Sequence, residues 1–228
     1  MATVALLGAS IDTNSGTHTS TLTPTLNDLM VVLTIATGNT STAAVTDNQG
    51  GTYTVIFSAL KNSSADTMLW HVRNQLVSSA VSTIYSHAPG TSTGGGLAVF
   101  RVIGMTRTGL LAVRQFAKQE NQAAATPAPA FGTAVLTANA CIGGIFNATN
   151  PAAMTPPASW TELGDSGYAT PTTGYEAAHR NSGETGTTIT WGSASASAFC
   201  SGAIELDVTG VPDDHRKSLN QAVKRSNI

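Results

Sequence analysis

The side chains best suited to chemistry in this sequence are five histidines and a few scattered carboxylates. The histidines are His18, His71, His87, His179 and His215. No two of them have the spacing of a metal-binding motif, and neither cysteine belongs to a Cys-x-x-Cys pair. His71 and His179 fall near equivalent places in the two halves of the chain, so we expect both to be half-exposed histidines on structural strands.

Two acidic segments admit a functional and a structural interpretation. Asp47-Asn48-Gln49-Gly50-Gly51 carries oxygen ligands of the kind that Ca²⁺ prefers, but the same residues are typical of a hairpin turn, which we favour. Glu205 and Asp207 lie two apart on one face of a predicted strand, and paired carboxylates can hydrolyse glycosides. Since no aromatic side chains for sugar stacking surround them in sequence, we expect a solvated strand face instead.

A hydrolase would need two acidic or basic side chains from distant segments to converge in one pocket. The candidates are Asp47, Glu162, Glu176, Glu205 and His179. Gly94-Gly95-Gly96 precedes a strand and not a helix, so it does not predict a phosphate-binding loop. The three tryptophans are far apart in sequence, and we expect each to fill a core. We therefore predict that the protein is not an enzyme, with no catalytic residue, no cofactor and no metal site.

Composition favours exposed β-sheet faces over helices. Charged residues are 11% of the chain, against about 25% in an ordinary soluble domain. Serine and threonine must therefore wet much of the surface, and threonine favours strands. The net charge is −2, and no long basic block exists, so nucleic acid is not expected as a partner. No segment has the apolar length of a membrane span, and we expect no membrane partner.

The cysteines and the N-terminal segment bear on where the protein is made. Cys141 and Cys200 could form one disulfide or remain as buried thiols, and we favour the thiols. The N-terminal segment has no basic region and only a short apolar run, so no signal peptide is predicted.

Two similar glycine-led strands organise the chain. Gly94–Val102 and Cys200–Val208 each contain a glycine followed by alternating apolar residues, and each ends a long Ser/Thr-rich segment. Further matches keep an offset of roughly 105 to 111 residues, as an internal duplication would. One of them pairs Thr52–Ile56 with Ser159–Leu163.

We predict an all-β protein of two tandem antiparallel β-sandwich units, jelly-roll or immunoglobulin-like in type, produced by this duplication. The units span residues 1–105 and 106–210, and residues 211–228 form a short C-terminal arm, mobile or ordered by a partner. The arm concentrates charge, and Leu219 and Val223 are spaced for a short helix. Its expected interface residues are Arg216, Lys217, Leu219, Val223, Lys224 and Arg225.

Several motifs of the first half resemble those of small β-sandwich modules in bacteriophage virion proteins and bacterial surface proteins. The residues that carry the resemblance are Asp28-Leu29, Val45-Thr46-Asp47-Asn48, Gly51-Thr52-Tyr53, Trp70, Asn74 and Gly96-Leu97-Ala98-Val99. The second half matches loosely, because it lacks the Asp-Asn turn and has Ala177 where Trp70 stands. The resemblance implies a structural module and has no active site to transfer.

The resemblance and the low charge together imply a structural protein of a phage virion, made in the host cytoplasm. Its most concrete form is a capsid decoration (cement) protein that binds the major capsid protein or another virion protein. We expect a homo-oligomer, a trimer if it sits at threefold positions of the head lattice. The alternative is a tail, fibre or cell-surface adhesin module that binds carbohydrate, which exposed Trp and Tyr on one face would favour.

Overall fold

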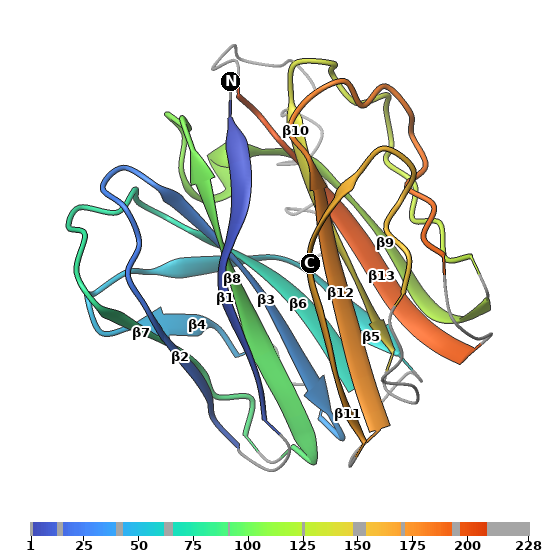
Figure 1. Cartoon of the computed structure of the whole chain (residues 1–228), viewed down its shortest axis with the longest axis horizontal. Helices are drawn as coiled ribbons and strands as arrows, with labels where there is room; N and C mark the ends of the chain where they lie inside the picture. The colour runs from blue at the N-terminus through green and yellow to red at the C-terminus, as the bar shows by residue number, and fades with distance from the viewer. Residues whose placement is uncertain are drawn as a thin grey trace, which may run out of the picture.

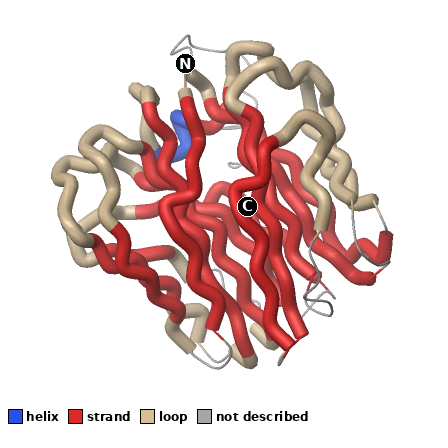
Figure 2. Tube along the Cα trace, viewed as in Figure 1, coloured by secondary structure: helices blue, strands red, loops and turns tan. Residues whose placement is uncertain are grey.

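The computed structural model describes residues 2–12, 16–39, 43–61, 66–90, 92–124, 126–147, 154–169, 172–192 and 197–208. Nearly all of the regular structure in these residues is strand, with one short 3-10 helix, η1 (Gly109–Ala112) (Figures 1 and 2). The all-β antiparallel fold expected from the sequence is confirmed. None of the described helical structure is long and apolar enough to cross a membrane.

The first half of the chain folds into two antiparallel sheets, called sheets A and B. Sheet A has the spatial order β1 (Thr3–Asp12), β8 (Gly94–Ile103), β3 (Leu29–Thr37), β6 (Asp66–Arg73) and β5 (Tyr53–Lys61). Sheet B has the order β2 (His18–Leu22), β7 (Thr83–His87) and β4 (Val45–Asp47). Sheet B lies at the left of Figure 1, beside sheet A.

The second half forms one further antiparallel sheet, sheet C. Its spatial order is β11 (Thr161–Ala169), β12 (Thr172–Arg180), β10 (Ala140–Asn147), β13 (Ser197–Leu206) and β9 (Val113–Ala124). Read in reverse, this order repeats that of sheet A strand for strand. A β-bulge interrupts β5 between Val55 and Phe57 and β11 between Glu162 and Gly164, at matched positions. The agreement fits the duplication, which stays a prediction.

The central strands of sheet A are buried on both faces. All nine residues of β3 are buried, which explains why this strand is a continuous apolar run and does not alternate. One face packs on sheet B through residues such as Met30 and Val32. The other packs on sheet C, where Phe57 of β5 stacks on Phe116 of β9 with ring centroids 5.1 Å apart. Side chains from both halves of the chain therefore share one core.

The outer face of sheet C is covered by loops, where the first half has sheet B. Trp160 and Trp191 pack there in a separate apolar cluster. Trp70 lies in the core between sheets A and C, so the expectation that each tryptophan fills a core is confirmed. Cys141 faces these loops whereas Cys200 faces sheet A, and both are buried free thiols, as favoured from the sequence.

Sheets A and C approach closely where sheet C has glycines. Gly144 and Gly202 are cross-strand partners on the face toward sheet A. A Cβ atom on Gly144 would lie 2.9 Å from Cζ2 of Trp70 and 3.2 Å from Cδ2 of Leu33. The absence of side chains at these glycines therefore makes room for the large side chains of sheet A.

We predict that Gly144→Ala lowers the free energy of unfolding by about 1–3 kcal/mol, because the added methyl group overpacks the core. Urea denaturation measures the change. The matched control is Gly132→Ala, where a Cβ would have no atom within 4 Å, and its effect should stay within about 0.5 kcal/mol. Equal effects of the two substitutions would contradict close packing between sheets A and C.

Candidate functional site

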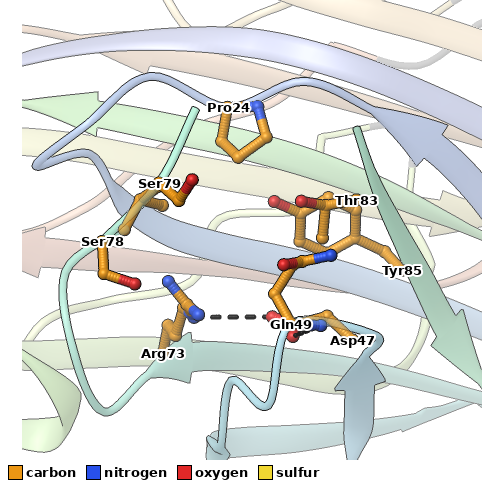
Figure 3. A pocket seen from close by; sticks show the side chains of 9 residues that line it. Pro24, Asp47, Gln49, Arg73, Ser78, Ser79, Thr83 and Tyr85 are labelled. Carbon is orange, nitrogen blue, oxygen red and sulfur yellow. Dashed lines mark hydrogen bonds and ion pairs between the residues drawn. The ribbon is translucent and has the colours of Figure 1, made fainter. Parts of the chain in front are cut away.

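A small polar pocket lies where the ends of β4 and β6 meet the loop before β7 (Figure 3). Its cavity volume is about 40 Å³, which is room for a few water molecules. The lining residues are Pro24, Asp47, Gln49, Arg73, Val77, Ser78, Ser79, Thr83 and Tyr85. Of the five side chains that a hydrolase could have combined, this pocket contains only Asp47.

Asp47 holds the turn at the base of this pocket. Its Oδ1 accepts hydrogen bonds from the backbone N–H groups of Gln49 (2.9 Å) and Gly51 (2.8 Å). Its Oδ2 accepts one from the Tyr53 hydroxyl at 2.9 Å and lies 3.5 Å from Nε of Arg73. Burial, followed by the Asp47 charge, raises the pKa of Tyr53. The turn interpretation of this segment is confirmed, since both carboxylate oxygens bind groups of the protein, but the turn is not a hairpin, because β4 pairs with β7 in sheet B and β5 pairs with β6 in sheet A.

Glu205 is fully buried, so the expectation of a solvated strand face is wrong. Its Oε2 accepts hydrogen bonds from Nη1 of Arg114 and Nε2 of Gln115, both at 2.6 Å. Its Oε1 accepts from Nδ2 of Asn139 (2.6 Å) and from the backbone N–H of Leu136 (2.9 Å). Four donors from β9 and the loop before β10 surround one carboxylate, which stabilises that loop over sheet C.

Asp207 is also buried, in a separate ion pair. Its Oδ2 lies 2.9 Å from Nη1 of Arg107, and its backbone N–H donates to the carbonyl of Ala112 at 2.9 Å. Alternation along a strand shows which residues share a face, but it does not show that a loop covers that face. Glu205 and Asp207 are therefore structural ions of the fold.

The half-exposed positions expected for His71 and His179 are wrong, because the structure buries both. His18, His71 and His87 are all fully buried. The rings of His71 and His87 are 5.8 Å apart, and Nε2 of His71 lies 3.0 Å from the Thr34 hydroxyl oxygen. Burial, and next a neighbouring histidine, lower the pKa of His71 to about 3 and that of His87 to about 4. These rings are therefore neutral at pH 7.

His71 and His179 do not occupy equivalent places. His71 pairs with Val32, on the face of sheet A toward sheet B. His179 pairs with Ile142, on the face of sheet C toward sheet A, and it is 9% exposed. In the described part of the chain, no group of three or more His, Cys, Asp or Glu side chains could hold a metal ion.

Glu176 is a buried carboxyl group with no hydrogen-bond partner among the described residues. It lies on the outer face of sheet C, opposite Asp165 of β11. Burial, and then the charges of Glu162 and Asp165, raise its pKa to about 8. Of the candidate carboxylates, the structure therefore brings Glu162 and Glu176 together. Glu205 lies apart, hydrogen-bonded to four donors of the protein.

Most of the exposed large apolar side chains of the described residues belong to segments at one end of the molecule. Seven large apolar side chains of the described residues are exposed, and five of these belong to segments at one end of sheets A and C. We call these five the apolar end: Leu26, Ile103, Leu110, Leu111 and Leu136. The sequence signal for it was Leu110-Leu111, two adjacent apolar residues outside any alternating pattern. The predicted interface residues Arg216, Lys217, Leu219, Val223, Lys224 and Arg225 lie outside the described residues.

The strand registers place the five side chains at the same end. Leu29 pairs with Val102, so the start of β3 lies beside the end of β8. Leu206 pairs with both Ala140 and Val113, so the end of β13 lies beside the starts of β10 and β9. The backbone N–H of Val4 donates to Oδ1 of Asn181 at 2.8 Å, which joins the two sheets at this end. The short helix lies there too, near the N-terminus in Figure 2.

No family model matches the chain, and no curated protein matches it.

We predict that Glu205→Ala lowers the free energy of unfolding by about 3–5 kcal/mol, because the half-buried Arg114 loses its carboxylate partner and the buried Gln115 and Asn139 lose their acceptor. Thermal or urea denaturation measures the loss. The control is Lys118→Ala, which breaks the partly exposed Lys118–Glu120 pair and should cost at most about 1 kcal/mol. Glu205 would be no structural ion if the two variants were equally stable.

The raised pKa of Glu176 predicts that the free energy of unfolding falls as pH rises. The folded chain holds this proton between pH 4.5 and about 8, whereas the unfolded chain has released it, so folding is progressively disfavoured across that range. Glu176→Gln should therefore gain stability over the wild type toward pH 8, on the order of a few kcal/mol, with little difference at pH 4.5. Urea titrations across this range measure it, and a gain independent of pH would refute the account.

Proposed function

We propose that this protein is a structural component of a bacteriophage particle, and most concretely a capsid decoration protein that binds the major capsid protein. It is made in the host cytoplasm, has no catalytic role, and assembles as a homo-oligomer, with a trimer favoured. The sequence supports this proposal through the motifs that resemble those of virion β-sandwich modules.

The structural observation that supports the proposal is that carboxylates suited to catalysis bind other groups of the protein. Asp47, Glu205 and Asp207 bind groups of the protein itself, and side chains from both halves of the chain share one core. Such a distribution suits a rigid body that contacts other subunits, and a lattice of many subunits adds avidity to each weak contact.

The carbohydrate-binding alternative finds no support in the described aromatic side chains. Trp70, Trp160 and Trp191 are buried, as are Tyr53, Tyr85 and Tyr175. Sugar recognition by stacking needs such rings at the surface. The decoration proposal therefore has the stronger basis. Both functions, decoration and carbohydrate binding, are binding functions without catalysis.

We predict that deleting residues 211–228 leaves a folded protein that binds shells more weakly. The full chain and the deletion variant are each mixed with empty shells assembled from the major capsid protein of the same particle and are then pelleted. The full chain should pellet with the shells, and the variant should need at least about tenfold more protein for equal binding.

Thermal melting of both proteins is the control for folding. A variant that fails to fold would show that residues 211–228 belong to the core and would overturn the role of the arm. Failure of the full chain to pellet would overturn the decoration proposal itself.

A further inference from the structure

We propose that residues 209–228 of this chain dock on its own apolar end and cover Leu110 and Leu111. The segment lies outside the described residues, and the argument rests on the surface beside the last described residue, Val208. It does not depend on the particle proposal, because its tests use the purified chain alone.

The apolar end is unusual for the described surface. Leu111 is 62% exposed, and Leu110 beside it is 49% exposed. Adjacent exposed leucines on a short helix cost solvation free energy, and exposed apolar side chains that lie together are typical of a contact surface. The other exposed large apolar residues, Val81 and Ile84, lie in the loop before β7 and on β7 of sheet B.

The last described residues of the chain lie at the apolar end. β13 ends at Leu206, and the backbone N–H of Asp207 donates to the carbonyl of Ala112 in η1 at 2.9 Å. The backbone N–H of Val208 then donates to Oδ1 of Asn139 at 3.3 Å. The last described residues, Asp207 and Val208, therefore lie beside the helix that carries Leu110 and Leu111.

Length and composition make this segment the best occupant. An extended chain advances about 3.3 Å per residue, so residues 209–228 suffice to cross one end of a small β-structure. Tethering gives the segment an effective concentration of about a millimolar or more, which a separate partner lacks. It also supplies apolar side chains at helical spacing, Leu219 and Val223.

The ions around the apolar end are already paired with each other. Arg107 lies 2.9 Å from Asp207, Arg114 lies 2.6 Å from Glu205, and Arg101 lies 3.9 Å from Asp28. Charge attraction therefore contributes little to the contact. We infer that the apolar residues of the segment bind the leucines and that its basic residues face solvent.

Limited proteolysis by trypsin tests the proposal, because the segment contains four cleavage sites. These follow Arg216, Lys217, Lys224 and Arg225. Docking should make these sites in the full chain at least about tenfold slower to cut than in a synthetic peptide of residues 209–228. The double variant Leu110→Ser/Leu111→Ser should be cut at nearly the peptide rate.

The matched control is Val81→Ser/Ile84→Ser, which removes two exposed apolar side chains of the β7 region and should leave the cleavage rate unchanged. Mass spectrometry identifies the sites, and thermal melting checks that both variants fold. Cleavage of the wild type at the peptide rate would overturn the proposal. So would equal effects of the two double variants.

A disulfide cross-link separates docking within one chain from docking on a second copy. Leu111→Cys combined with Val223→Cys should, on oxidation, give a product with the mass of a single chain under denaturing conditions. Ile84→Cys combined with Val223→Cys is the control and should give no such product. Cross-linked pairs of chains would show that another copy supplies the segment, and would overturn docking within the chain.

Discussion

The central strands of sheet A are buried on both faces. The rest of the structure depends on this constraint. A strand such as β3, with all nine residues buried, is stable only when both of its faces are covered. Sheet B covers one face and sheet C covers the other, so the first half cannot bury its central strands without the second. The glycines of β10 and β13 let Trp70 and Phe57 project into the second half. These residues join the two halves of the chain into one layered body.

This layering also decides what the polar residues do. A chain with 11% charged residues has few ions, and burying one is costly unless it is paired and hydrogen-bonded. Asp47 stabilises a turn, Glu205 stabilises a loop over sheet C, and Asp207 binds Arg107 near the end of the described chain. Glu176 is the exception, and its raised pKa keeps it largely protonated at neutral pH. Groups that could have done chemistry in an open cleft act here in folding.

The sequence predicted the features that depend on local pattern. Apolar runs and turn residues were enough for the all-β class, for the turn at Asp47 and for buried tryptophans, whereas the hairpin expected there is a connection between sheets B and A. Features that depend on what covers a face were not predictable. Glu205 and His71 occupy strand positions that alternation alone treats as half exposed, yet a loop covers one and sheet B covers the other. The apolar end was missed because it forms only where segments distant in sequence meet.

The central claim is that this body functions by occupying positions on a particle. Cryo-electron microscopy of empty shells, incubated with excess full chain and then washed, tests it most directly. The account predicts added density at symmetry-related lattice positions, into which the three-sheet body fits. Shells with no added density, at protein concentrations that saturate weak binding, would contradict the account.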